Sequence, residues 1–473
     1  MKKTIVYILI TILVSTQSSC KKDLNALPVN AKVDGNVIVD GKSAEVALNG
    51  AYYRFAEAGN DRGTPSTQWT LAHEIIPSWA AGYLDYPYGG GVLTINTLNS
   101  QSYEANVIWP ASYLLINAAN GVIKGVETLP GSKIEATRKK EIIAEAHFLR
   151  AYGHYRLLSF YGQYYDAGSQ YGVMLRKEFV TTDNIAQPRS TVQESYDYIL
   201  SDVDDAIANA PESNAPYYAT QWAAKALKAR ILMNRGGAGD YEQVISIAKD
   251  FASNSPYQLE ANLQDIFSTK GLDSKEVILG VTPLPNQVSK HDTYNYYGPG
   301  YIATNSLKAL LQDDPRNNWV IGDIEFSGIG ITKYGALNAG GFLDGPKLEV
   351  NYAFRLTEIY LLQAEATVRS GGSLATAKTI LKTVMANAGV TDFTQVVNAN
   401  TADVLLLEIY KETVKNMVCE DGQDWFALLR LPLETITTLK PTIIRKEQFI
   451  MPIPHDEFIK NNAIGQQNPG YDK

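Results

Sequence analysis

Cysteine is scarce in this chain, since only Cys20 and Cys419 occur among its 473 residues. A small secreted domain that depends on disulfides carries several cysteines in an even number, so the sequence excludes that class. We expect Cys419 to be a buried, unpaired side chain that packs like a small apolar residue. A chain of this length can instead be stabilised by a large apolar core.

Charged residues are also few. Lys, Arg, Asp and Glu together make up 19% of the sequence, the formal net charge is −8, and like charges do not form runs. Proteins that bind nucleic acids need clustered Lys and Arg to neutralise phosphates. The composition therefore argues against a nucleic-acid partner.

The apolar run at the N-terminus is too short to span a bilayer. It follows two lysines and leads through small residues to Cys20. This order predicts a lipoprotein signal peptide over residues 1–19, lipidation of Cys20, and a lipidated tether over residues 20–42. Acyl chains would then hold the protein at a membrane without a transmembrane helix. The alternative is an ordinary secretory signal, because Gln17 stands where lipoprotein signals usually have an aliphatic residue.

Common catalytic motifs are absent from the sequence. There is no nucleophile elbow, no phosphate-binding loop and no zinc-protease helix, because His73-Glu74 lacks the required second histidine. His147 and His154 lie two helical turns apart, which is too far to chelate one metal ion, and we expect them in the core or an interface. A glycosidase needs two carboxylates across a cleft, and distant loops could supply such a pair without a motif. The sequence therefore predicts no catalytic residue, no metal site and no cofactor.

Most of the chain shows the helical period. Apolar residues recur at steps of three and four over Lys140–Tyr161, Tyr196–Ala210, Trp222–Met233, Tyr241–Phe251, Ile359–Ala388 and Val404–Met417. A glycine-rich turn at residues 236–239 joins two of these helices into a hairpin, and Ser43 is a good N-cap for an opening helix. We expect the carboxylates of this region to lie on a solvated helix face: Asp202, Asp204 and Asp205. Paired helices of this kind stack in tetratricopeptide-type repeats, so the pattern predicts a mainly α scaffold in a single domain over residues 43–473.

Two long segments interrupt the helical pattern, near residues 59–109 and 254–352. Both are rich in Gly, Asn, Pro and Tyr. Long insertions without repeats in a helical scaffold usually form functional loops, so we expect binding to take place there.

Aromatic residues interleaved with amides and carboxylates in these insertions fit a sugar-binding surface. Sugar rings pack on aromatic faces, while their hydroxyls need hydrogen-bonding partners. The predicted ligand-binding residues are Trp79, Tyr83, Asp85, Tyr86, Tyr88, Asn96, Tyr294, Tyr296, Tyr297 and Trp319. The alternative is that these rings only fix the loops to the helices. We expect that structural role for Trp109, Tyr113, Trp425 and Tyr471.

Five segments of the chain, in order, resemble the SusD/RagB family of outer-membrane lipoproteins. They are EAHFLRAY at 145–152 with the following Phe160-Tyr161-Gly162, the alanine-rich Ala223–Arg230, RLTEIYLLQAE at 355–365, DWFALLR at 424–430, and the tail from MPIP at 451–454 to QNPGY at 467–471. The segment KNMVCEDGQ at 415–423 departs from the family pattern, as does Asp424, where a basic residue is common. This departure concerns local salt bridges rather than the fold.

The resemblance implies a right-handed, SusD-like helical repeat and a surface-exposed protein held at the outer membrane by its lipid anchor. It also implies a SusC-like, TonB-dependent transporter as partner, on which the protein sits as a lid. Such a protein captures oligosaccharide or polysaccharide nutrients, or in some members peptides, and delivers them without breaking bonds. The alternative is a tetratricopeptide-like surface lipoprotein that binds only peptides or proteins, which would not bind any sugar.

Overall fold

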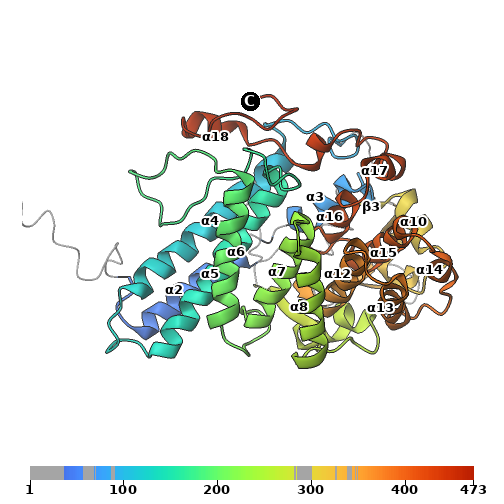
Figure 1. The fold of residues 1–473 in the computed structure, drawn as a ribbon, viewed down its shortest axis with the longest axis horizontal. Helices are drawn as coiled ribbons and strands as arrows, with labels where there is room; N and C mark the ends of the chain where they lie inside the picture. The colour runs from blue at the N-terminus through green and yellow to red at the C-terminus, as the bar shows by residue number, and fades with distance from the viewer. Residues whose placement is uncertain are drawn as a thin grey trace, which may run out of the picture.

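The fold is built mainly from helices (Figure 1). The computed structural model describes residues 37–56, 69, 71–86, 91–281, 284, 301–324, 328–337, 343–346, 348 and 350–473. Within these ranges the strands are short and the helices carry most of the buried side chains. The predicted mainly α class is therefore confirmed. The predicted signal peptide, lipidation site Cys20 and most of the tether lie outside the described residues.

The first half of the scaffold is a series of helices in which chain neighbours pack against each other. They are α2 (Gly41–Phe55), α3 (Leu71–Ala80), α4 (Tyr103–Glu127), α5 (Ala136–Tyr161), α6 (Val192–Asn209), α7 (Gln221–Arg235) and α8 (Asp240–Asn254). Contacts join α4 to α5, α5 to α6, α6 to α7, and α7 to α8. In Figure 1, α2 and α4 to α8 run from the left side of the molecule to its centre, whereas α3 lies beside α16.

The second half continues the array. Its helices are α10 (Asn305–Leu311), α11 (Asn317–Val320), α12 (Leu356–Arg369), α13 (Leu374–Asn387), α14 (Thr394–Asn398), α15 (Ala402–Met417), α16 (Gln423–Leu429), α17 (Leu433–Leu439) and α18 (His455–Lys460). A π turn at Ile266–Lys270 and 3-10 turns at Gly271–Asp273 and Lys446–Phe449 complete it. Helix α12 packs against α13, α15 and α8, so it joins the two halves.

Local signals explain where several helices begin and end. Asp40 caps α2 and forms a reciprocal capping box with Ser43, whose hydroxyl accepts a hydrogen bond from the Asp40 backbone. The prediction of Ser43 as the N-cap is therefore wrong by three residues, because Ser43 occupies the partner position of that box. Helix α7 ends at Gly236 with φ 59°, which confirms the predicted hairpin turn.

Helices α4 and α5 approach closely because glycine lies between them. A Cβ at Gly153 would lie 2.7 Å from Ile116 Cγ1 and 3.2 Å from the Ser112 carbonyl oxygen. The C-terminal two thirds of α5 are buried on nearly all sides. One of the aspartates predicted to be solvated is part of this region: Asp202 is buried and forms a salt bridge of 2.7 Å with Arg150 of α5. The prediction is wrong for Asp202 because the sequence did not show that Arg150 would face this residue.

The strands form three small antiparallel sheets. They are β1 (Leu84–Asp85), β2 (Val277–Val281), β3 (Ile302–Ala303), β4 (Ile321–Ile324), β5 (Gly328–Ile331), β6 (Gly335–Leu337), β7 (Leu343–Pro346) and β8 (Asn351–Arg355). Strand β2 pairs with β8, and β6 pairs with β7. The largest sheet has the order β1-β3-β5-β4, and it contains strands from both insertions.

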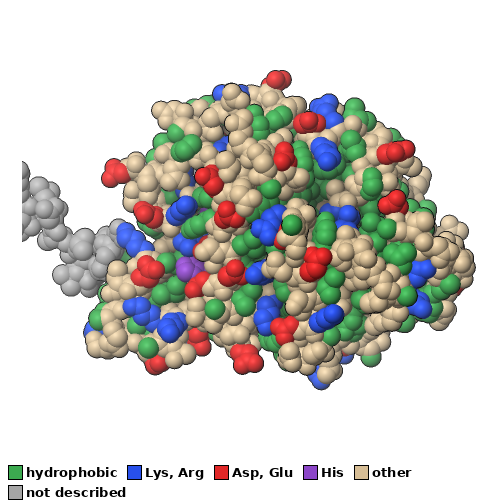
Figure 2. Space-filling model, in the orientation of Figure 1, with side chains coloured by type: hydrophobic (Ala, Val, Ile, Leu, Met, Phe, Trp, Pro, Cys, Tyr) green, Lys and Arg blue, Asp and Glu red, His purple; other side chains and the backbone are tan. Residues whose placement is uncertain are grey.

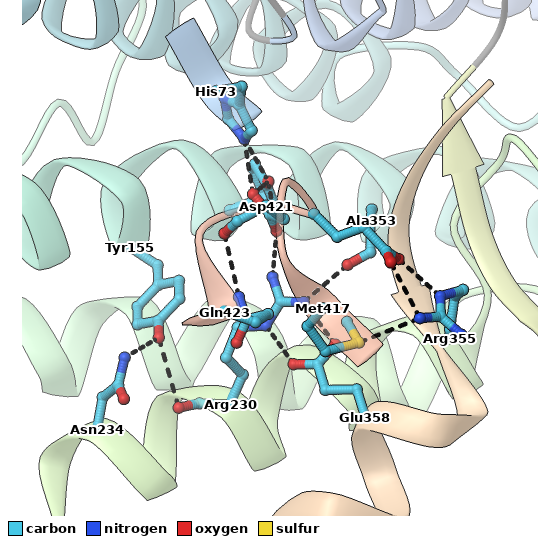
Figure 3. A network of polar contacts seen from close by, with 12 residues as sticks. His73, Tyr155, Arg230, Asn234, Ala353, Arg355, Glu358, Met417, Asp421 and Gln423 are labelled. Atoms are coloured by element: carbon cyan, nitrogen blue, oxygen red, sulfur yellow. Dashed lines mark hydrogen bonds and ion pairs between the residues drawn. The ribbon is translucent and has the colours of Figure 1, made fainter. Parts of the chain in front are cut away.

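A buried ionic network holds the turn between α15 and α16 (Figure 3). Asp421 has φ 48° and lies 2.7 Å from His73 Nε2 and 2.9 Å from Arg156 Nη1. It also pairs with Arg230, whose guanidinium donates two hydrogen bonds of 2.7 Å to Glu358 of α12. The attraction of Arg156 and Arg230 outweighs burial and holds the pKa of Asp421 well below its usual range.

The same turn contains Cys419, which is fully buried and free, as predicted. Its backbone N–H donates to the hydroxyl of Ser78 in α3 at 3.0 Å. The turn thereby ties the first insertion to the late helices. Across the described ranges, no helix has both the length and the apolar character that a bilayer crossing requires.

Candidate functional site

The two predicted binding insertions meet in the four-stranded sheet. Strand β1 comes from the first insertion and pairs with β3 of the second, with Leu84 opposite Ala303 and Asp85 opposite Ile302. Thr304, which follows β3, donates from its backbone to the Tyr83 carbonyl at 3.0 Å and from its hydroxyl to the Gly82 carbonyl at 2.7 Å. Segments more than 200 residues apart in the chain are therefore held in register.

Tyr301 is at the centre of an aromatic cluster beside this sheet. Its ring contacts Trp79 edge to face, with centroids 5.5 Å apart, and Tyr86 in the same manner at 6.5 Å. Burial, followed by the negative charge of Glu104, raises the pKa of Tyr301 to about 12. The phenol therefore stays neutral at physiological pH and can both donate and accept a hydrogen bond.

Tyr103 adds an exposed ring to this neighbourhood. It begins α4, and its side chain is 71% exposed. The ionised form of Tyr103 would raise the pKa of Tyr301. Sequence reasoning missed it, because the residue stands outside the aromatic runs of the insertion. Its position directly before the structural Trp109 helix is the only signal that could have pointed to it.

Asp85 presents one carboxylate oxygen that is fixed and one that is free. Its Oδ1 accepts from the Thr94 hydroxyl at 2.7 Å and from the Tyr86 backbone N–H at 2.8 Å. Thr94 in turn accepts from the indole Nε1 of Trp79 at 2.8 Å. Asp85 Oδ2 has no hydrogen-bond partner within the part of the chain that the structure describes. An oriented, half-exposed carboxylate of this kind is a suitable acceptor for a ligand hydroxyl.

Lys440 places a positive charge under the same site. Its ammonium donates to the Thr94 carbonyl at 2.8 Å. Burial lowers the pKa of Lys440 to about 8, although the nearby charge of Asp85 opposes this shift. Asn96, with φ 51°, is held on the neighbouring loop by Thr442, whose hydroxyl donates to its Oδ1 at 2.6 Å. The end of α17 and the segment after it thus support the loop that carries Thr94 and Asn96.

The structure places some of the predicted binding residues at the candidate site and buries others in the scaffold. Asp85, Tyr86 and Asn96 lie half-buried at the site. Trp79 and Tyr83 are only 6% and 4% exposed, so their rings fix the insertion to the scaffold in this structure. The Tyr83 hydroxyl shares a hydrogen bond with that of Tyr410 in α15.

The remaining predicted residues lie elsewhere or are not described. Trp319 is half-buried and stacks on Phe267, with ring centroids 5.6 Å apart. Tyr88, Tyr294, Tyr296 and Tyr297 lie outside the described residues. The structural roles predicted for Trp109, Tyr113 and Trp425 agree with their packing: Trp109 and Trp425 are buried, and Tyr113 donates to the Met174 carbonyl.

The described residues offer no evident metal centre, since no three His, Cys, Asp or Glu side chains among them converge. His147 forms a 2.6 Å contact with Asp205, and His154 is fully buried beside α6, as predicted for core or interface histidines. The groups that the described part of the site offers to a ligand are the aromatic rings, the free carboxylate oxygen of Asp85 and the ammonium of Lys440.

Two family models match the chain. The SusD-like model described as "Starch-binding associating with outer membrane" matches residues 79–233, and the SusD family model matches residues 293–442. Together these segments cover more than half of the sequence. A curated SusD-like protein from Bacteroides ovatus is 24% identical over 272 residues, which cover 55% of this chain and 46% of that protein. The chain thus spans about half the length of this curated relative.

Solved structures share the whole fold. A SusD superfamily protein from Bacteroides thetaiotaomicron superposes with a TM-score of 0.72 at 21% identity, covering 90% of this chain and 99% of that one. A second, from Bacteroides fragilis, gives 0.73 at 21% identity and covers 91% and 100%. These helical neighbours confirm the predicted tetratricopeptide-like, SusD-like scaffold.

Proposed function

Because the chain belongs to the SusD/RagB family, we propose that it is a cell-surface lipoprotein that binds oligosaccharide or polysaccharide nutrients. In this proposal it delivers them to a SusC-like, TonB-dependent transporter in the outer membrane. The family model that matches residues 79–233 carries a starch-binding, outer-membrane description. Attachment to the membrane through Cys20 supplies the location.

One observation supports the proposal most: the pairing of β1 with β3 brings Asp85, Tyr86 and Tyr301 together from separate insertions. A sugar needs a flat apolar surface for its C–H face and acceptors and donors for its hydroxyls. Tyr86 and Tyr301 offer the rings, and the free oxygen of Asp85 offers the acceptor. The Tyr301 hydroxyl supplies a neutral group that does both.

Binding without catalysis fits the same geometry. A retaining or inverting glycosidase needs two carboxyl groups on opposite sides of the scissile bond. In the described site, Asp85 contributes a carboxylate whose charge acts on the ammonium of Lys440. This arrangement is suited to holding a polar ligand, and we assign no chemical step to it.

The experiment that tests the proposal is a glycan screen with the full mature chain. Native gels that contain soluble starch, xylan, polygalacturonate, mannan or host glycans report binding as retarded migration. Retardation by at least one polysaccharide is expected. Absence of binding to every sugar, together with binding of peptides, would contradict glycan capture and favour a peptide-binding lipoprotein. Co-purification of a barrel protein with the acylated chain tests the transporter partner separately.

A further inference from the structure

A groove lies at the β4 edge of the four-stranded sheet, opposite the edge formed by β1. It has a volume of about 470 Å³ and is formed by α10, the start of α11, and strands β4 and β5. Its floor is apolar and includes Ile321 and Ile329. Its rim carries the polar side chains of Asn305, Lys308, Gln312 and Asn317.

The four polar side chains of this groove are unengaged. In the described ranges, none of them forms a hydrogen bond or salt bridge to the protein through its side chain, whereas the hydroxyls of Thr304 and Thr332 beside the sheet each donate a hydrogen bond. Asn305, Lys308 and Gln312 recur on one face of α10, so their side chains share a rim. A convergent set of unpaired donors and acceptors over an apolar floor is typical of a ligand groove.

The side chains that line the groove limit the chemical class of ligand that it can bind. Asn and Gln side chains each carry a donor and an acceptor, as a sugar hydroxyl does. No carboxylate belongs to the described lining, and Lys308 contributes the one charge. The groove therefore suits a neutral or weakly acidic chain with many hydroxyls.

The register of the sheet relates this groove to the Asp85 site. Asp85 pairs with Ile302, Ile302 with Gly330, and Gly330 with Gly322, which lines the groove. Paired residues in neighbouring strands lie on the same sheet face, and successive residues alternate between the two faces. The floor residues Ile321 and Ile329 therefore lie on the face opposite Asp85, which is the face of Tyr301, the residue before Ile302. Three strand spacings separate Asp85 from Gly322, or about 14 Å. Two binding places this close can engage the same polysaccharide chain.

We propose that the α10/β4 groove is a second saccharide site, which binds the same polysaccharide as the Asp85 site and raises affinity for the polymer through avidity. The inference rests on the proposed function, because both sites bind glycan. Two linked sites raise polymer affinity on the order of tenfold or more over a single site. A short oligosaccharide occupies each site separately and gains nothing from the link.

The test blocks the groove without disturbing the core. Ala309 is an exposed groove residue in the middle of α10, so Ala309→Trp fills the groove. Ala375→Trp, at an exposed alanine of α13 outside the groove, is the matched control. The probes are the polysaccharide that retards the wild-type chain most strongly in the panel above and its oligosaccharides of about four units. The double variant Asn305→Ala, Gln312→Ala removes the two amides from the rim without adding bulk. Thermal melting followed by circular dichroism checks that every variant is folded.

Ala309→Trp and the double variant are expected to lower polymer affinity at least about tenfold, while Ala375→Trp behaves as the wild type. Calorimetric titration with the oligosaccharide is expected to give two sites per wild-type chain and one per Ala309→Trp chain. Unchanged polymer affinity in both groove variants would overturn the second site while leaving the proposed function intact. A wild-type chain that binds no polysaccharide would overturn both.

Discussion

Asp85 is the residue whose environment is most specific to binding. Two donors fix one of its oxygens, and the other has no hydrogen-bond partner among the residues that the structure describes. The surrounding structure therefore orients the acceptor before a ligand arrives. Little conformational entropy remains to be lost on binding, which favours affinity.

Replacement of this acceptor should weaken sugar binding. Asp85→Asn keeps an oxygen for Thr94 but places an amide where the free carboxylate oxygen was. We expect the affinity for a short oligosaccharide to fall about tenfold, because a hydrogen bond to a charged group is lost. Isothermal titration measures this change. Asp403→Asn, at an exposed aspartate in the first turn of α15, is the matched control and should leave affinity unchanged.

Buried ion pairs make the stability of the fold sensitive to acid. Burial alone would raise the pKa of Glu365, but Arg430 and Arg369 outweigh it and lower the pKa to about 2. A carboxylate with a depressed folded-state pKa contributes stability that is present above its unfolded pKa, near 4.3, and is lost as pH falls toward 2. Asp421 acts in the same direction.

We therefore expect the free energy of unfolding to fall by about 3 kcal/mol from Glu365 alone between about pH 5 and pH 2. Urea denaturation at a series of pH values checks this. Glu365→Gln should flatten the dependence in that window while lowering stability at neutral pH, since it leaves Arg430 and Arg369 partly unpaired. A slope that is the same in wild type and variant would contradict the assignment.

Elements of the fold differ in how well the sequence predicted them. The helices predicted over Lys140–Tyr161 and Tyr196–Ala210 end within one residue of the predicted limits but begin four residues earlier, because long apolar stripes of period 3.6 are a strong signal that does not fix the first turn. Strands β1 and β3 have two residues each, and two residues cannot show alternation. The pairing that assembles the site is a tertiary contact, so no local pattern could reveal it.

The same limit applies to the candidate site residues. Trp79 and Tyr86 belong to the same aromatic-rich run, yet the first is buried and the second is half-exposed. Residue type predicted that both rings would bind ligand. The burial of each ring depends on its tertiary partners, which for Trp79 include Thr94 and Tyr301. Tyr301 follows the aromatic run of the second insertion in the sequence, and its central place follows from the β1–β3 register.

Two helical glycines offer a matched test of helix packing. Gly153 faces Ile116 of α4, whereas the space around Gly50 in α2 is open. Alanine has the higher helix propensity, so Gly50→Ala should stabilise the protein by about 0.5–1 kcal/mol. Gly153→Ala should instead destabilise it by about 1–3 kcal/mol, because its Cβ overlaps Ile116. Denaturant midpoints measure both changes, and equal signs would contradict the proposed close approach of α4 and α5.

At the scale of the whole molecule, the scaffold is one array of helices whose late turn is tied to its early helices. The Asp421 network joins α3, α5, α7 and α12 (Figure 3). On the face shown in Figure 2, acidic and basic side chains are interspersed. Such a surface agrees with a neutral ligand better than with a strongly charged polymer.

The central claim is that two insertions, distant in sequence, build one sugar-binding surface. Calorimetric titration of one retained oligosaccharide into Tyr86→Ala and Tyr301→Ala variants tests it most directly, because each ring belongs to a different insertion. The account predicts that each variant folds as the wild type does and binds about five- to tenfold more weakly, as expected for the loss of one ring contact. Affinity that is unchanged in either variant would contradict a shared site.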